Sequence, residues 1–423
     1  MGENLEILQS VQSQYKEAAS DLGLDPAVYE ILKDVERLIE VSLPIKMDDG
    51  STKVFKAYRS AHSSILGPSK GGVRFNENVN ANEVKALSMM MTIKSALLSL
   101  PLGGGKGGLK VDPESLSDRE LESLARAYVR AINNYLGSDI DVPAPDVNTN
   151  PKIMGYFIDE YIALNGGKVD FGTFTGKPIS LGGSLGRSAA TGYGLALSVK
   201  YAYEQRGESL EAKTFALQGF GNVGYFAAKY LCEFGAILVG LNARDKEAPS
   251  GSSAIYSTKG LDVEELQAIR ENEGSALNYA KAEKITNEEF FALDVDILLP
   301  CALENAIDEK IAPSIKARVI GEGANGPTTD KAAELLEDKG VLIIPDILAN
   351  SGGVLVSYYE WVQNRTGSYL TLEEVQEKQR DQMTRVFEEV FAIARDKNVN
   401  LRRASFMKAL ERLSDGLKYR GRF

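Results

Sequence analysis

Histidine and cysteine are scarce in this sequence: its 423 residues include one histidine, His62, and two cysteines, Cys232 and Cys301. Both cysteines lie in apolar runs, which argues against a disulfide framework and indicates a reducing, cytoplasmic compartment. These residues are too few for a zinc site, so we expect no metal cofactor. General acid–base chemistry near neutral pH must then depend on a lysine or a carboxylate with a shifted pKa.

The sequence also lacks long apolar runs and an excess of positive charge. No apolar stretch reaches the ~20 residues that span a bilayer, and the polar, acidic N-terminus is not typical of a signal peptide. A net charge of −11 argues against nucleic acid or an anionic membrane as a partner. The length and a hydrophobic content of 43% predict a globular chain with two domains.

The first half of the chain mixes helical and extended patterns. Apolar spacing predicts helix over 3–40, an extended segment over 54–65 and an apolar helix over 82–100. GPSKGGVRF is rich in turn residues, and LPLGGGKGGLKVD, at 100–112, is expected to be a glycine–lysine loop. A capping box, SDRE, predicts a helix from 117 to about 135. A proline-punctuated loop over 141–151 precedes a helix that ends at Leu164.

The second half alternates short apolar strands with helices. KTFALQ, GFGNVG, YFAAKYLCEF and AILVGLN form a strand–loop–helix–strand unit, and further strands are expected at 295–302, 318–323 and 341–346. This α/β alternation predicts a parallel sheet with helices on both faces. From Gly352 the pattern is helical, with a capping box, TLEE, before a helix to about Arg395.

We therefore expect an α/β protein of three segments. Residues 1–183 form a substrate-binding domain, 184–350 form a Rossmann-type dinucleotide-binding domain, and 351–423 form helices that pack back on the first domain.

Gly219, Gly221 and Gly224 give the pattern G-x-G-x-x-G between a strand and a helix. The first glycine permits a tight turn, the second lets a pyrophosphate approach, and the third lets helix and strand pack closely. The alternative is a plain glycine turn. The second strand ends at Ala243 and Arg244, where an acidic residue would select NAD. Arginine here favours the 2′-phosphate of NADP or use of both cofactors, whereas the following Asp245 leaves NAD open.

Lys106 lies among five glycines, but the stretch fails the phosphate-loop pattern at both ends, where Leu100 and Gly107 stand. Lys70 lies among glycines as well, and Lys94 lies on an apolar helix. If these three lysines converge, two can neutralise a dicarboxylate, and crowding lowers the pKa of the third. The alternatives are a flexible loop with a solvated Lys106 and a Lys94 that extends from the helix edge to water.

Asp146 lies in the loop punctuated by Pro143 and Pro145. The two prolines restrict the backbone, which suits a carboxylate that must be placed accurately. An ordinary Asx turn is the alternative interpretation.

Six motifs in order resemble the hexameric glutamate dehydrogenases: GPSKGGVRF, LPLGGGKGGLKVD, VPAPDVNTN, TFALQGFGNVG, GEGANGPTT and LANSGGVLVSYYEW. The resemblance runs from about residue 25 to the C-terminus. It implies that Lys106 is the catalytic lysine and Asp146 the proton shuttle. It also implies that Lys70 and Ser357 bind the side-chain carboxylate of the substrate, and that Lys94 binds its α-carboxylate.

For the cofactor, the resemblance implies nicotinamide contacts at Thr191, Asn325 and Asn350, beside Asn222 and Val223 of the glycine motif. The implied reaction is reversible oxidative deamination of L-glutamate to 2-oxoglutarate and ammonia with NAD or NADP, in a homo-oligomer, a hexamer. The related leucine, valine and phenylalanine dehydrogenases are an alternative, but they resemble the chain less at Lys70. A catalytically silent subunit or a dinucleotide sensor is a second alternative, which intact Lys106 and Asp146 disfavour.

Overall fold

The computed structural model of the chain describes residues 5–245, 248 and 251–423. It divides into two compact units, each built from separate stretches of sequence. The first unit comprises Met1–Arg187, Val354–Val375 and Arg403–Phe423, and the second comprises Ser188–Gly353 and Gln376–Arg402. The chain thus enters the second unit twice. None of the described helices combines the length and the apolar character that a membrane span requires.

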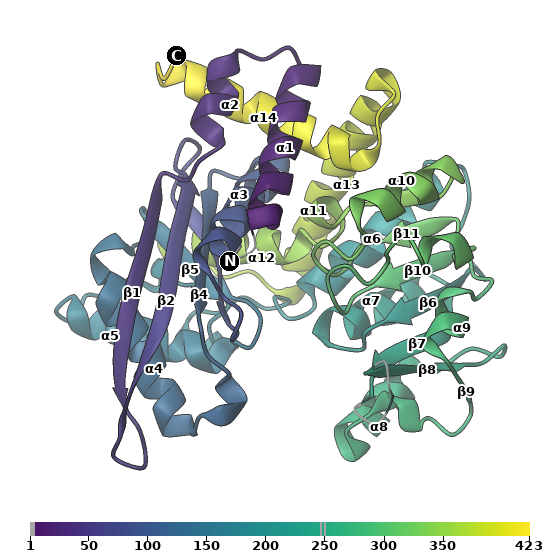
Figure 1. Cartoon of the computed structure of the whole chain (residues 1–423), viewed down its shortest axis with the longest axis horizontal. Coiled ribbons are helices and arrows are strands. Elements are labelled where there is room, and N and C mark those ends of the chain that lie inside the picture. Colours follow the sequence, from purple (N-terminus) through teal and green to yellow (C-terminus); the bar gives the residue numbers. More distant parts are fainter. Residues whose placement is uncertain (1–4, 246–247, 249–250) are drawn as a thin grey trace. The chain divides into compact units, whose positions relative to one another are not determined.

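The first unit is built on a five-stranded sheet in the order β1-β2-β4-β3-β5 (Figure 1). β1–β2 and β2–β4 are antiparallel, whereas β3 is parallel to both β4 and β5. The strands are β1 (Arg37–Lys46), β2 (Thr52–Ser63), β3 (Ser69–Phe75), β4 (Gly103–Leu109) and β5 (Asp141–Pro145). The helices of this part are α1 (Leu5–Asp21), α2 (Pro26–Leu32), α3 (Ala81–Leu97), α4 (Asp118–Ile132) and α5 (Pro151–Leu164).

The core of the first unit joins the sheet to α4 and α5. Phe55, Val73 and Leu109 from the strands are buried with Tyr128 of α4 and Phe157 of α5. The predicted capping box at the start of α4 is confirmed, since Ser117 and Glu120 satisfy each other's backbone amides.

The predicted helix over 3–40 is wrong at its end. α2 ends at Leu32, and from Arg37 the chain is a strand that pairs with β2 over ten residues. The segment RLIEVSLPIK alternates apolar and polar residues in its second half, which is the period of a strand rather than of a helix.

The glycine–lysine stretch is predicted to be a loop, and this prediction is wrong. Gly103–Leu109 form β4, the central strand of the sheet. Glycine weakens an isolated strand, yet it is required where another backbone approaches the sheet closely. A Cβ at Gly104 would overlap the Ser88 carbonyl oxygen and the Thr92 amide nitrogen of α3, and one at Gly107 would lie 2.5 Å from the Tyr128 hydroxyl. The glycines therefore let the backbone of α3 approach one face of this strand and the Tyr128 side chain of α4 approach the other.

The predicted proline loop over 141–151 is wrong over its first five residues, which form β5. β5 is an edge strand that pairs with β3 on one side, Gly71 lying opposite Pro143 and Val73 opposite Pro145. Proline is tolerated there because an edge strand needs no backbone donor on its open side. The turn-rich GPSKGGVRF likewise becomes β3 from Ser69 onward.

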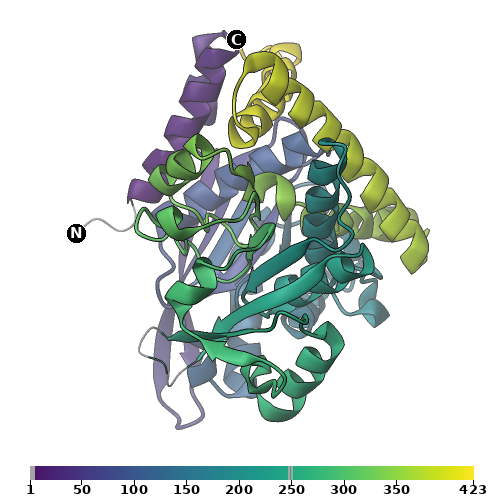
Figure 2. The ribbon, with the colours of Figure 1, turned by 90° about the vertical axis from the view of Figure 1, so that its right-hand side faces the viewer.

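The second unit contains a seven-stranded sheet in the order β12-β11-β10-β6-β7-β8-β9, which Figure 2 shows in teal and green. The strands are β6 (Thr214–Gln218), β7 (Ile237–Arg244), β8 (Ser252–Tyr256), β9 (Glu283–Ile285), β10 (Ile297–Pro300), β11 (Val319–Gly321) and β12 (Leu342–Ile344). Five strands are parallel, as expected, but β8 and β9 form an antiparallel edge that the sequence did not suggest. The chain order reverses between β6 and β10, where an open α/β sheet binds its ligand.

Helices complete the second unit and the C-terminal part of the chain. They are α6 (Ala190–Glu204), α7 (Asn222–Glu233), α8 (Val263–Glu273), α9 (Asn287–Phe291), α10 (Asp330–Asp338), α11 (Asp346–Ala349), α12 (Gly352–Thr366), α13 (Leu372–Lys397) and α14 (Leu401–Tyr419). The predicted TLEE capping box starts α13, where the Thr371 hydroxyl accepts from the Glu374 amide and the Glu374 carboxylate accepts from the Thr371 amide.

Candidate active site

Lys106 lies in the middle of β4, between two positions that have no side chain. Because side chains alternate along a strand, Lys106 shares a face with Gly104 and Gly108, and Gly104 packs against α3. Lys106 is only 5% exposed. The flexible loop with a solvated amine, which the sequence left open, is therefore wrong.

The Lys106 ammonium contacts Asp146, the carboxylate that follows β5. Lys106 Nζ lies 2.6 Å from Asp146 Oδ2, and Arg74 Nε of β3 lies 2.9 Å from the same oxygen. Arg74 also binds Glu83 of α3 at 2.5 Å. The Asp146 amide donates to Thr149 Oγ1, whose hydroxyl donates to the Val73 carbonyl, so the turn after β5 is fixed to β3. Four charged side chains thus form one chain of contacts.

Burial shifts the titration of this pair. Burial lowers the pKa of Lys106 to about 8, with the Arg74 and Lys94 charges acting in the same direction and the Asp146 carboxylate opposing them. Burial alone would raise the pKa of Asp146, but the Lys106 and Arg74 charges outweigh it and hold that pKa well below its usual range. Lys106 therefore has a sizeable neutral fraction near pH 8, where an ordinary lysine is fully charged.

Lys94 lies in the last turn of α3 and is 7% exposed. Its side chain therefore does not extend to water, which was the alternative left open by the sequence. The Lys94 charge lowers the pKa of Lys106, so the two amines interact electrostatically.

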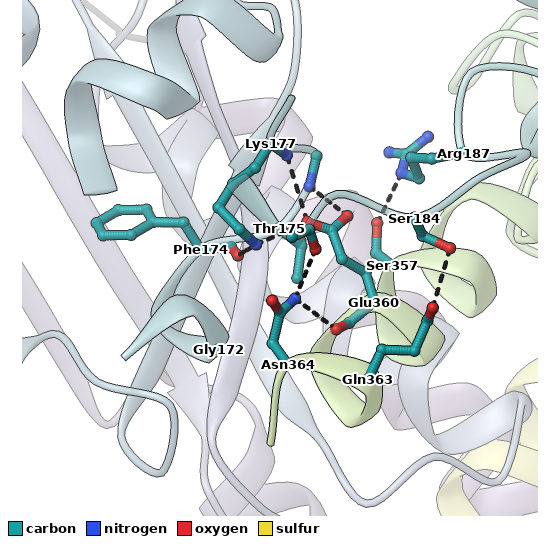
Figure 3. A network of polar contacts seen from close by, with 12 residues as sticks. Gly172, Phe174, Thr175, Lys177, Ser184, Arg187, Ser357, Glu360, Gln363 and Asn364 are labelled. Carbon is teal, nitrogen blue, oxygen red and sulfur yellow. Dashed lines mark hydrogen bonds and ion pairs between the residues drawn. The ribbon is translucent and has the colours of Figure 1, made fainter. Parts of the chain in front are cut away.

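Lys70 belongs to a second cluster, shown in part in Figure 3. Its Nζ donates to Thr175 Oγ1 at 2.6 Å, and both residues are buried. Burial lowers the pKa of Lys70 to about 7, the Glu360 carboxylate acts in the opposite direction, and the Arg187 charge adds to the lowering. The Lys94 charge thus acts on Lys106, and the convergence of all three lysines stays a prediction.

Ser357 lies on α12 in the same cluster. Arg187 Nε donates to Ser357 Oγ at 2.7 Å (Figure 3). Sequence reasoning did not select Arg187, Arg74, Thr175 or Glu360. The signal available in the sequence was a charged residue within a glycine-rich or apolar motif, such as the arginine of GGVRF and of SLGRSAATG.

The glycine motif of the second unit has the geometry that a pyrophosphate requires. Gly219 has a φ of +89°, a Cβ at Gly224 would overlap the Gly219 carbonyl oxygen, and a Cβ at Gly221 would meet no atom within 4 Å. α7 starts directly after Gly221 with no side chain capping its amides. The first turn of α7 therefore presents free amides beside open space, which fits an anion.

The neighbouring candidate residues lie around this turn. Asn222 Nδ2 donates to the Ser188 carbonyl at 2.6 Å, and a Cβ at Gly192 would lie 2.7 Å from the Val223 carbonyl oxygen. The first turn of α6, which carries Thr191, therefore packs directly on the first turn of α7.

Asn325 and Asn350 are brought together by two loops of the second unit. Asn350 Nδ2 donates to Asn325 Oδ1 at 3.0 Å and to the Gly323 carbonyl at 3.3 Å. Arg402 supports both loops, because it binds Glu322 at 2.6 Å and Asp346 at 2.8 Å. Sequence reasoning did not select these three charged residues.

The end of β7 carries the residues expected near the adenosine ribose. Ala243 is half-buried and Arg244 is exposed. Asp245 follows the strand, and its Oδ2 accepts from Ser253 Oγ of β8 at 2.7 Å.

The single histidine has a structural environment. His62 is 1% exposed, with Nδ1 at 2.7 Å from Thr92 Oγ1 and Nε2 at 2.8 Å from the Leu32 carbonyl oxygen. Burial lowers its pKa to about 4, so His62 is neutral at physiological pH.

Known proteins resemble this chain over most of its length. Residues 182–421 match the Glutamate/Leucine/Phenylalanine/Valine dehydrogenase family, and residues 35–163 match its dimerisation domain. The chain is 50% identical to the NAD-specific glutamate dehydrogenase of Peptoniphilus asaccharolyticus and 46% identical to that of Clostridioides difficile, with 100% and 99% of each chain covered.

A solved structure extends the likeness to three dimensions. The hetero-hexameric glutamate dehydrogenase of Thermus thermophilus, in its leucine-bound form, matches with a TM-score of 0.93 and 34% identity over 100% of this chain and 98% of that chain. The chain belongs to the Glu/Leu/Phe/Val dehydrogenase family.

Proposed function

We propose that this chain catalyses the reversible oxidative deamination of L-glutamate to 2-oxoglutarate and ammonia with NAD as the hydride acceptor. The observation that carries the choice of glutamate is the Lys70 cluster, in which Lys70, Arg187 and Ser357 offer donors to a second carboxylate. An aliphatic side chain would leave the buried Lys70 ammonium and the half-buried Arg187 guanidinium without a substrate carboxylate to bind, which is costly. A leucine- or phenylalanine-type substrate is therefore disfavoured, and the relatives named above point the same way.

Lys106 and Asp146 supply the proton transfers in this proposal. Asp146 takes a proton from the substrate ammonium, and the 2.6 Å contact lets that proton pass to the neutral form of Lys106. When bound, NAD would supply the hydride acceptor, and loss of hydride from Cα would leave the substrate as an iminium ion. Once Lys106 has released that proton to solvent, it takes a proton from the water that attacks the iminium carbon, and a carbinolamine forms. Lys106 then returns this proton to the carbinolamine nitrogen while Asp146 takes the proton of the hydroxyl group, so that ammonia leaves and the keto acid remains.

The remaining residues bind the two reactants. Lys94 pairs with the α-carboxylate, and Lys70 with Ser357 binds the side-chain carboxylate. The amides after Gly221 bind the pyrophosphate, while Thr191, Asn325 and Asn350 hold the nicotinamide. NAD-specific relatives support NAD over the NADP preference that Ala243 and Arg244 suggested, and we assign the ribose hydroxyls to Asp245, the carboxylate that follows β7.

Initial rates of nicotinamide reduction test this function. Glutamate with NAD should give the highest kcat/KM among glutamate, leucine and norvaline, each measured in parallel with NAD and NADP. Activity with leucine and none with glutamate would show that the substrate is wrong. A higher kcat/KM with NADP than with NAD would show that the cofactor is wrong.

We further propose a cytoplasmic homo-hexamer, on the two unpaired cysteines and on the hexameric relative. Light scattering of the purified chain should give about six times the monomer mass of 46.0 kDa. The division into a substrate-binding domain to about 183, a dinucleotide domain to about 350 and a returning helical segment also stands as a proposal. Separate expression of residues 184–350 with retained NADH binding would support it.

A further inference from the structure

Glu360 is a fully buried carboxylate that contacts none of the reacting groups proposed above. It lies on α12, one helical turn after Ser357 (Figure 3). Its side chain and that of Lys177 are both 0% exposed, and Glu360 Oε1 lies 2.8 Å from Lys177 Nζ. Burying a charge pair of this kind is expensive and does not by itself stabilise a protein, so the pair invites a functional explanation.

Both oxygens of Glu360 bind one short segment, residues 174–177. Oε2 accepts from the Gly176 amide at 2.7 Å, and Oε1 accepts from the Lys177 amide at 3.3 Å as well as from Lys177 Nζ. Lys177 Nζ also donates to the Phe174 carbonyl at 2.5 Å. The Glu360 carboxylate therefore holds residues 176–177, and the Lys177 ammonium, which Glu360 neutralises, holds Phe174.

Thr175 lies at the centre of the segment held in this way. Its hydroxyl is the group to which Lys70 Nζ donates at 2.6 Å, and its amide donates to the Pro143 carbonyl of β5. The position of the Thr175 hydroxyl decides where the Lys70 ammonium points. Glu360 can therefore influence Lys70 through Thr175 without touching the substrate.

α12 also holds the segment of chain that leads to Arg187. Gln363 Nε2 donates to Ser184 Oγ at 3.1 Å, and Asn364 Nδ2 donates to the Gly182 carbonyl at 2.9 Å (Figure 3). Arg187 follows this stretch and donates to Ser357. One face of α12 thus holds both segments that bring cationic groups to the cluster.

We propose that Glu360 is a positioning residue for the subsite of the substrate side-chain carboxylate, and that it acts through Thr175 on Lys70. The inference rests on the proposed function, because it concerns the second carboxylate of glutamate. The charge of Glu360 acts in the same sense, since it opposes the loss of the proton from Lys70 and Arg187 that burial favours.

Three variants test the proposal: Glu360→Gln, Thr175→Val and the double variant. Glutamine keeps the size of Glu360 but loses the charge and one acceptor, and valine removes only the hydroxyl that receives Lys70. Each single variant should raise the KM for glutamate about tenfold and leave kcat within about threefold, as expected for a lost hydrogen bond to a charged group. The double variant should be no worse than Thr175→Val alone, because the two residues act in series.

Norvaline separates positioning from general structural support. It has the five-carbon chain of glutamate without the second carboxylate, so its kcat/KM should be unchanged in all three variants. Glu30→Gln is the matched control, because Glu30 also pairs with a lysine, Lys33, but is exposed at the surface of the same unit. Its kinetic constants should be those of the parent.

The outcomes are distinguishable. Parallel losses for glutamate and norvaline, or additive effects in the double variant, would show that Glu360 only supports the fold. If Glu360→Gln does not fold, Thr175→Val carries the test alone, and a parental KM for glutamate would overturn the proposal. Absence of glutamate oxidation by the parent would instead refute the proposed function itself.

Discussion

The two glycine clusters of this protein, 103–108 and 219–224, use the absence of a side chain in opposite ways. In β4 the missing side chains are replaced by protein: a Cβ at Gly104 would overlap the backbone of α3, and one at Gly108 would lie 2.5 Å from Val79. At Gly221 nothing lies within 4 Å of the missing Cβ. One cluster packs protein against protein, and the other leaves room that a ligand can take.

The clusters also differ in charge. β4 carries a lysine between its glycines, buried and 2.6 Å from a carboxylate. The 219–224 cluster carries no charged side chain and offers helix amides instead. A phosphate can be bound by such amides, whereas proton transfer needs a titratable group. The following predictions separate these two uses of glycine, beginning with the largest expected effect.

Replacing the lysine of the first cluster should abolish catalysis without affecting the second. Lys106→Met should lower kcat for glutamate about a thousandfold, the range expected when a general acid–base group is lost. The affinity for NADH, measured by fluorescence titration, should stay parental. Lys110→Met is the matched control, because Lys110 lies just beyond β4 and is exposed. A kcat for Lys106→Met within tenfold of the parent would show that β4 has no catalytic role.

Adding one methyl group to the first cluster should damage the fold. Gly104→Ala places a Cβ on the backbone of α3, so we expect a loss of about 3 kcal/mol in the free energy of unfolding. Urea denaturation measures this loss. A control glycine must have a negative φ, which excludes Gly23. Gly221→Ala, at a φ of −81°, is the better control for stability. Equal stabilities of the two variants would contradict the packing role.

The same methyl group in the second cluster should affect the ligand instead. Gly221→Ala has space for its Cβ and an ordinary φ, so its unfolding free energy should change by no more than about 0.5 kcal/mol. The Kd for NADH should rise about tenfold, because the methyl group enters the space assigned to the pyrophosphate. Fluorescence titration gives this Kd, and a parental value would show that the pyrophosphate lies elsewhere.

The smallest effect concerns pH. Because the neutral form of Lys106 is the active one in our proposal, kcat/KM for glutamate should rise with pH through a pKa of about 8. The Arg74 charge helps to lower that pKa, so Arg74→Met should move the midpoint to higher pH, by less than about one unit. A pH–rate profile of both proteins measures the shift. A midpoint that moves to lower pH in Arg74→Met would contradict the assignment to Lys106.

Local signals in the sequence were enough for the two helices with capping boxes and for the strand–turn–helix unit around Gly219. The capping boxes at Ser117 and Thr371 act on their own helices, and the strand–turn–helix pattern around Gly219 is contiguous. β4 and β5 were misassigned because glycine and proline are read as loop residues. The glycines fit a strand because α3 packs closely against β4, and the prolines fit a strand because β5 lies at the edge of the sheet. Neither fact can be read from the residues next to these glycines and prolines in the sequence.

The candidate site shows the same limit. Lys106 and Asp146 could be selected from their own motifs, and the structure places them in contact. Glu360 could not, because Lys177, its partner, is 183 residues away and a lone glutamate in SYYEW resembles a surface residue. Buried charge pairs between distant segments are visible only once the fold brings those segments together.

The glycine run of β4 also has a genetic consequence. Every missense change in a glycine codon adds at least a Cβ, and a Cβ would overlap backbone at Gly103 and Gly104 and would lie 2.5 Å from a neighbouring side chain at Gly107 and Gly108. Almost no conservative substitution is therefore possible at these glycines. Mutations that are accepted at surface positions are therefore expected to be lost at these four glycines, whereas synonymous changes in their codons remain possible.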